Sequence, residues 1–157
     1  MRKRQITSPL QSARTSDEAW LDLDHAAVVE VTSEEEGRPI ESALVGDDKL
    51  GWRAAGKGKQ TIRLIFDQPQ RLKRIWLVFE ESENTRTQEF VLRSSQDQGN
   101  SFREIVRQQW NFSPPDSIRE IEDYTVDLYE VTQLELIIVP DKSGSDARAS
   151  LVNLRLG

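Results

Sequence analysis

The stretch GWRAAGKGKQTIRLIFDQPQRLKRIWLVFE, residues 51–80, decides the fold of this chain. In each half of it, apolar side chains occupy every second position: Ile62, Leu64 and Phe66, then Ile75, Leu77 and Phe79. Such alternation is typical of β-strands that turn one face toward a hydrophobic core. Pro69 has no backbone N–H to donate to a central ladder, so we expect it between the two strands. The stretch therefore predicts an antiparallel sandwich in which a β-hairpin, or a longer crossover between two sheets, joins these strands.

Other short segments have strand-like patterns that end at polar residues, glycine or proline: residues 28–32, 88–95, 102–112, 124–128, 134–139 and 151–156. The apolar residues of 102–112 fit helical and strand spacing alike. We expect a strand there, because its neighbours are β and Ser113-Pro114-Pro115 ends the pattern abruptly. Residues 134–139 are expected to be the deepest strand, buried on both faces near its C-terminal half. Short strands without a long amphipathic helix predict an all-β fold, an antiparallel β-sandwich of the jelly-roll type.

The length of 157 residues and the hydrophobic fraction of 36% fit one domain with a single core. Residues 1–17 are polar and aperiodic, so we expect a flexible N-terminal arm followed by a single sandwich domain over residues 18–157. The basic N-terminus is not followed by the apolar stretch of a signal peptide, and no run approaches the roughly 20 apolar residues of a transmembrane helix. We therefore expect a cytoplasmic protein without a transmembrane segment.

The charge balance bears on the partners of the protein. Asp and Glu number 27 against 21 Lys and Arg, for a net charge of -6 at pH 7. This makes nucleic acid an unfavoured partner, although the basic residues between Lys57 and Arg74 could form a local patch. The chain has no cysteine, which excludes disulfide bonds and thiolate metal sites.

Several motifs follow one another in a characteristic order: Trp52-Arg53-Ala54, then Gln60-Thr61-Ile62-Arg63-Leu64 with Phe66 and Pro69, residues 72–79, Phe90-Val91-Leu92 with Ser95, Asp97 and Gly99, and Ala149-Ser150-Leu151. In this order they resemble a discoidin or coagulation factor 5/8 type C domain over about residues 42–157. The resemblance implies a galactose-binding-like β-sandwich without enzymatic activity. It also implies binding of carbohydrate, or in some relatives of lipid headgroups, proteins or nicked DNA, through loops at one end.

Many members of that family hold a structural calcium ion in the loop before the tryptophan-bearing strand, with an acidic residue near the last strand as a further ligand. Here Asp47 and Asp48 lie in that loop, but Asn153 stands where the distal acid is expected. Carboxylates contribute most of the affinity of a calcium site, so an amide at that position weakens it. Calcium is a candidate cofactor on this resemblance, and a solvated turn at Asp47-Asp48 is the alternative.

Sugar-binding proteins usually place an aromatic ring against the apolar face of a sugar and surround it with hydrogen-bonding side chains. We expect the ligand rim in three loops, residues 46–51, 81–88 and 141–148. The candidate ligand-binding residues are Arg53, Asn84 and Arg86 for polar contacts, and Trp20 and Trp110 for an aromatic platform. The alternatives are surface ion pairs for the arginines and core packing for the tryptophans.

No catalytic constellation stands out in the sequence. His25 is the only histidine, and neighbouring acids such as Glu80-Glu81 do not by themselves make the carboxylate pair of a glycosidase. We therefore expect a non-catalytic binding module for carbohydrate or glycoconjugate. The alternative is a protein-interaction or assembly module, including a homo-oligomer, with no sugar ligand.

Overall fold

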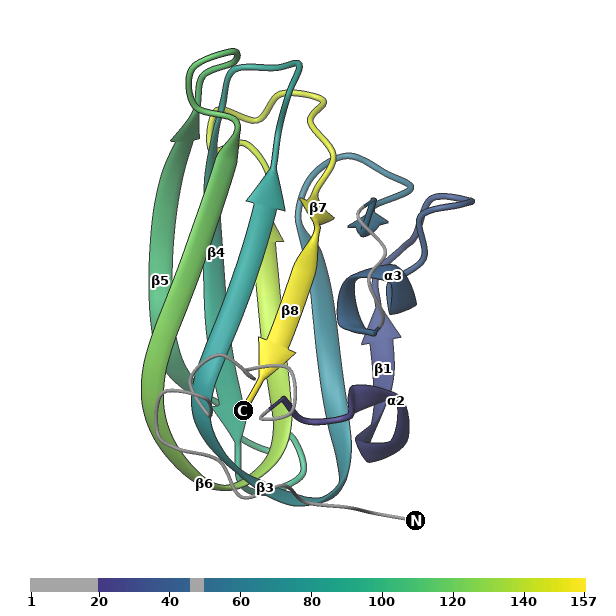
Figure 1. Cartoon of the computed structure of the whole chain (residues 1–157), viewed down its shortest axis with the longest axis vertical. Helices are drawn as coiled ribbons and strands as arrows, with labels where there is room; N and C mark the ends of the chain where they lie inside the picture. Colours follow the sequence, from purple (N-terminus) through teal and green to yellow (C-terminus); the bar gives the residue numbers. More distant parts are fainter. Residues whose placement is uncertain (1–19, 46–49) are drawn as a thin grey trace, which may run out of the picture.

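A computed structural model describes residues 20–45 and 50–157 of the protein. Its elements are α2 (Leu23–Ala26), β1 (Ala27–Val31), α3 (Glu41–Leu44), β2 (Trp52–Arg53), β3 (Gln60–Glu80), β4 (Arg86–Ser95), β5 (Arg103–Phe112), β6 (Arg119–Val139), β7 (Ser150–Leu151) and β8 (Asn153–Leu156), shown in Figure 1. All paired strands run antiparallel. The predicted all-β sandwich is confirmed, as is a strand over most of residues 102–112. The predicted arm, residues 1–17, lies outside the described residues.

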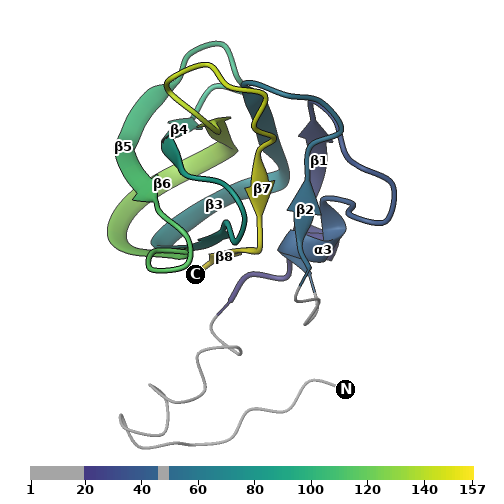
Figure 2. The same cartoon turned by 90° about the horizontal axis from the view of Figure 1, so that it is seen from above.

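Strands β3 and β6 are long and bent, and each contributes to both layers of the sandwich. The first half of β3 lies between β1 and β6, and its second half lies between β6 and β8. One layer therefore has the order β1-β3-β6-β4-β5, and the other contains β8 with the remaining halves of β3 and β6. Figure 2 shows these layers end-on, with β1, β2 and α3 to one side.

The segment around Pro69 is the crossover between the two layers, and the hairpin alternative was wrong. The register of β3 against β6 shifts between Ile65 and Arg74, and Pro69 falls in a gap of the ladder between Ile65 and Gln70. These shifts let one continuous strand bend from the first layer into the second. Proline is tolerated there because no ladder hydrogen bond needs its missing N–H.

The core lies between the two layers and contains both predicted apolar rows. The six residues of these rows are each at most 7% exposed: Ile62, Leu64, Phe66, Ile75, Leu77 and Phe79. The ring of Phe79 packs against Phe90 of β4, with centroids 5.2 Å apart. Full burial of each such side chain contributes roughly 1.5–3 kcal/mol. The two halves of β3, on either side of the bend, thus pack into the same core.

The segment 134–139 is buried on both faces at its N-terminal half, and not at the C-terminal half as predicted. Glu135, on the outward face, is 1% exposed because Arg63 and Arg93 cover it from the neighbouring strands. Ile137 and Val139 are only half-buried. Within the described residues, both helices have four residues, too few to cross a membrane.

Candidate ligand-binding site

A pocket of about 650 Å³ opens where the β3–β4 and β6–β7 loops meet. Both loops lie at the same end of the sandwich, at the top of Figure 1. Its lining comes from residues 80–86 and from the segment 145–150, with Arg38, Leu50, Arg53 and Ile118 completing it. Two of the three predicted rim loops, 81–88 and 141–148, therefore do meet. Of the third, only the last two residues are described, and Leu50 lines the pocket.

One side of the pocket carries arginines, and the pairing of β2 with β7 explains their position. Trp52 pairs with Leu151 and Arg53 with Ser150. Trp52 is fully buried, with its indole N–H donating to the Ser33 carbonyl at 2.9 Å. Because side chains alternate along a strand, Arg53 points away from the core and lines the pocket.

A single carboxylate, that of Glu35, lies beside two of these arginines. Its Oε1 is 3.6 Å from Nη1 of Arg53 and 3.1 Å from Nη1 of Arg148. The backbone fixes this placement, because the Glu35 N–H donates to the Arg53 carbonyl at 2.8 Å and the Arg38 N–H donates to the Glu35 carbonyl at 2.9 Å. Glu35 is therefore held by the same backbone that presents Arg53.

The opposite side is the loop between β3 and β4, which Glu81 organises. Its carboxylate accepts hydrogen bonds from the backbone N–H groups of Glu83 (3.0 Å) and Asn84 (3.2 Å) and from Nε of Arg86 (2.7 Å). Burial raises the pKa of Glu81, but these donors outweigh it and leave the pKa below its ordinary value. Glu81 is thus an ionised acceptor that shapes the loop.

Arg86 lies at the floor of the pocket and is 3% exposed. Besides Glu81, its guanidinium donates to the carbonyl of Pro140 at 2.8 Å and to Oε1 of Gln88 at 3.2 Å. It also stacks on the ring of Phe112, 4.7 Å from the centroid. Arg86 therefore mainly anchors the two loops to the core.

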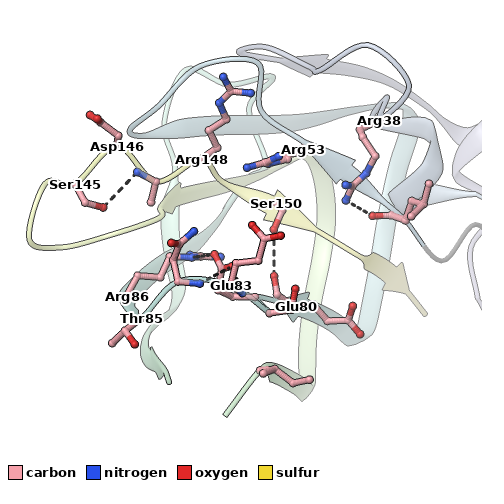
Figure 3. A pocket seen from close by; sticks show the side chains of 16 residues that line it. Arg38, Arg53, Glu80, Glu83, Thr85, Arg86, Ser145, Asp146, Arg148 and Ser150 are labelled. Atoms are coloured by element: carbon pink, nitrogen blue, oxygen red, sulfur yellow. Dashed lines mark hydrogen bonds and ion pairs between the residues drawn. The ribbon is translucent and has the colours of Figure 1, made fainter. Parts of the chain in front are cut away.

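Figure 3 shows Arg53 and Arg148 on one side of the pocket and Glu80 and Glu83 on the other. Glu80 pairs with Arg119 at 2.9 Å, whereas the carboxylate of Glu83 forms no ion pair with another described residue. Cationic and anionic groups thus face each other across the pocket.

Three of the five predicted ligand residues, Arg53, Asn84 and Arg86, line this pocket, and Trp20 and Trp110 do not. Trp20 stacks on Trp76, with centroids 6.2 Å apart. Trp110 is half-buried and packs against the core, as the packing alternative expected. The aromatic platform predicted from these two residues is therefore absent from the described lining, whose apolar members are Leu50, Ile118 and Ala147. Whether the lining residues bind a ligand stays a prediction.

Three residues at the site were not predicted from the sequence: Arg38, Glu35 and Ile118. Arg148 falls at the end of a predicted rim loop, which was a signal for it. No local pattern points to Glu35 and Arg38, because they reach the site through an isolated bridge between them and through backbone bonds to Arg53.

The basic island between Lys57 and Arg74 does not form a free cationic patch. Four of its six members pair with acids: Lys57 with Asp146, Arg63 with Glu30 and Glu135, Arg71 with Asp127, and Arg74 with Asp123. His25 is exposed and its Nδ1 lies 2.7 Å from Oδ2 of Asp22, which raises the pKa of the imidazole. It does not line the pocket.

Whether the loop before Trp52 holds the calcium ion that the resemblance implies stays a prediction. In the loop before Trp52, the carbonyl oxygens of Leu50 and Gly51 accept hydrogen bonds from the guanidinium of Arg38, at 3.1 Å for Gly51. A guanidinium thus already lies beside these oxygens. No cluster of three acidic or histidine side chains suited to a metal lies in residues 20–45 and 50–157. Asp47 and Asp48 are outside the described residues.

No protein-family profile and no curated protein matches the sequence. Solved structures do match the fold. A pectin-binding carbohydrate-binding module is 17% identical, with a TM-score of 0.63 over 85% of this chain and 91% of that one. The family 32 carbohydrate-binding module of Clostridium perfringens NanJ, in complex with galactose, is 14% identical, with a TM-score of 0.66 over 87% and 96%. XRCC1 bound to the DNA polymerase β catalytic domain is 14% identical, with a TM-score of 0.60 over 85% and 95%.

These likenesses show the fold. The chain has the antiparallel β-sandwich fold of these modules, which is the fold that its sequence motifs indicated.

Proposed function

We propose that this chain is a non-catalytic carbohydrate-binding module whose ligand lies in the polar pocket at the loop end of the sandwich. The observation that carries the proposal is the pocket itself. Guanidinium, carboxylate, amide and hydroxyl groups from loops far apart in sequence converge around about 650 Å³. Small-molecule sites in proteins commonly measure about 300–1,000 Å³. Such a mixture of donors and acceptors suits the hydroxyl groups of a sugar.

The fold neighbours support this proposal, because two of them are carbohydrate-binding modules and one was solved with galactose. The lining differs from an aromatic sugar platform. Leu50 and Ile118, which are 61% and 41% exposed, are left to contact the apolar face of a sugar ring. Binding would therefore depend mainly on hydrogen bonds, and we expect affinities in the micromolar to millimolar range.

The carboxylates of the pocket do not suit glycoside hydrolysis. That reaction needs one carboxylic acid with a raised pKa beside a second, ionised carboxylate. Glu81 has a lowered pKa and is committed to Arg86 and the loop backbone. The acid with a clearly raised pKa, Glu120, is fully buried in the interior and does not line the pocket. This supports a binding role without catalysis.

A glycan array followed by calorimetric titration of the best ligands tests the proposal. We expect at least one oligosaccharide to bind, and the double variant Asn84→Ala, Glu83→Gln to weaken that binding. Both side chains lie at the pocket and are exposed, so their replacement should leave the melting temperature unchanged. Absence of binding to every glycan, or binding that this double variant does not affect, would overturn the proposal.

A protein-interaction module is the second candidate, because the fold neighbour XRCC1 was solved bound to a polymerase domain. The outer edge of β5 borders no other strand in the described part of the chain. Light scattering across a concentration series tests self-association. A monomer at all concentrations would argue against the homo-oligomeric form of this candidate.

A further inference from the structure

We propose that the pocket selects carbohydrates that carry a carboxylate, such as hexuronates, and that Arg53 and Arg148 bind this group. The inference rests on the proposed function and names the ligand class of the same pocket.

The two guanidiniums share one carboxylate oxygen. Oε1 of Glu35 is the partner of Nη1 in both ion pairs, at 3.6 Å for Arg53 and 3.1 Å for Arg148. Two positive charges thus face one negative charge. The side chains of Arg53 and Arg148 are 43% and 41% exposed, so both remain accessible from the pocket. A second carboxylate, supplied by a ligand, would balance the charge.

The guanidinium groups also retain hydrogen-bonding capacity. Each carries five N–H donors, and two on one edge can bind a carboxylate in a bidentate manner. Among the described residues, the Arg148 guanidinium donates one hydrogen bond, to Glu35, and the Arg53 guanidinium forms only the longer ion pair. Donors therefore remain on both side chains for an incoming anion.

Arg38 adds positive charge to the same side of the pocket. Its donors go to the neutral carbonyl groups of Leu50 and Gly51, which do not cancel its charge. No carboxylate in residues 20–45 and 50–157 forms an ion pair with it. Arg38 thus strengthens the attraction for an anion without having to bind it.

The opposite side of the pocket determines how the ligand is oriented. Glu80 and Glu83 would repel a carboxylate but can accept hydrogen bonds from hydroxyl groups. A sugar acid satisfies both sides at once, with its carboxylate toward Arg53 and Arg148 and its hydroxyls toward Glu83. A neutral sugar offers the free guanidinium donors of Arg53 and Arg148 no charged acceptor.

Titration of one matched pair of ligands provides the test. The probes are an oligomer of galacturonic acid and the same oligomer after reduction of its carboxyl groups to primary alcohols. We expect the acidic oligomer to bind the wild-type chain roughly tenfold or more tightly than the reduced one, since a carboxylate can form bidentate ion pairs with guanidiniums and a primary alcohol cannot. Raising the NaCl concentration should weaken only the acidic ligand.

Arg53→Met and Arg148→Met test the assigned residues. Each should lose more affinity for the acidic oligomer than for the reduced one, by roughly tenfold. Arg53→Lys, which keeps the charge but not the bidentate geometry, should lose less than Arg53→Met. The matched control is Arg71→Met, because Arg71 is 51% exposed and pairs with Asp127 in the bend of β3, at the other end of the sandwich. It should bind both oligomers like wild type.

The outcomes separate this inference from the proposed function. If the reduced oligomer or other neutral glycans bind at least as well as the acidic oligomer, the carbohydrate-binding proposal stands and the selection of acids is wrong. If the arginine variants weaken both oligomers equally, the assignment of Arg53 and Arg148 is wrong. If no glycan binds at all, both proposals fail.

Discussion

The side-chain amide of Gln88 donates to the carboxylate of Glu120 across the interior of the sandwich, with Nε2 and Oε1 3.1 Å apart. Both residues are 0% exposed. The second oxygen of Glu120 has no hydrogen-bond partner among the described residues. Burial, and then the charge of Glu122, raise the pKa of Glu120 to about 7, while Gln88 and Arg86 lower it to a smaller extent.

This raised pKa predicts that the protein loses stability as the pH rises from about 4.5 to about 7. In this window the folded state keeps a proton on Glu120 that the unfolded state has lost, so folding becomes less favourable with increasing pH. Above pH 7 the cost is complete and amounts to about 3 kcal/mol. Glu120→Gln removes the titrating group, so it should raise the free energy of unfolding at pH 8 and change it little at pH 4.5.

Urea denaturation of wild type and Glu120→Gln at these two pH values measures the effect. Glu83→Gln serves as the control, because Glu83 is exposed and should leave the pH dependence as in wild type. A parallel pH dependence in wild type and Glu120→Gln would contradict the prediction.

Glu135 should show the opposite pH signature. Burial alone would raise its pKa, but Arg63 and Arg93 on the two neighbouring strands lower it below the ordinary value. The folded state then holds fewer protons than the unfolded state. The stability that ionised Glu135 contributes is therefore fully present above the pKa of the unfolded state, and it is lost as the pH falls through the pKa of the folded state. Glu135→Gln should therefore destabilise the protein at pH 7 by about 2 kcal/mol and much less at acidic pH.

Double-mutant cycles over Glu135→Gln, Arg63→Met and Arg93→Met provide the measurement. Each arginine should couple to Glu135 with a separate interaction energy, because Nε and Nη2 of Arg63 reach one carboxylate oxygen while Arg93 reaches the other. Coupling energies of zero for both pairs would show that this cluster contributes nothing.

Calcium should not stabilise the protein. The guanidinium of Arg38 already donates to the carbonyls of Leu50 and Gly51, which lie in the loop where the resemblance places the ion. We expect equal melting temperatures in millimolar calcium and in a chelator. Arg38→Met should lower the free energy of unfolding by about 1–3 kcal/mol, since it removes the hydrogen bonds that the guanidinium donates to the carbonyls of Leu50 and Gly51. A melting temperature that rises by several degrees with calcium would indicate an ion site at Asp47 and Asp48.

The alternating apolar rows predicted both halves of β3, because a strand with one buried face has apolar residues at every second position. The bend that joins these rows could not be read in the same way. The bend depends on register shifts between β3 and β6. Paired residues of these two strands are about 60 positions apart in the sequence. The sequence therefore left the hairpin and the crossover as equal alternatives around Pro69.

Some residues of the candidate site could be predicted from the sequence, and others could not. Asn84 and Arg148 could be found from their loops, since loops at one end of a sandwich tend to carry binding residues. Glu35 could not, because its position depends on a backbone bond to Arg53. The aromatic platform was predicted wrongly from Trp20 and Trp110, because rings that pack in the core and rings that bind sugars belong to the same residue type. The ring of Trp20 stacks on the ring of Trp76 instead of lining the pocket.

Gly51 should be far less replaceable than Gly58, although both have positive φ angles, of 69° and 82°. A Cβ at Gly51 would lie 2.3 Å from the carbonyl oxygen of Leu151 and 2.7 Å from Cα of Val152, whereas a Cβ at Gly58 meets nothing within 4 Å. Gly58→Ala should therefore cost only the left-handed backbone strain, about 1–2 kcal/mol. Gly51→Ala should cost several kcal/mol more, because the backbone of β7 cannot move without displacing Trp52 and the Arg53 side of the pocket. Thermal denaturation of the two variants under identical conditions measures the difference, and equal losses would show that the close approach of Gly51 to β7 is not needed.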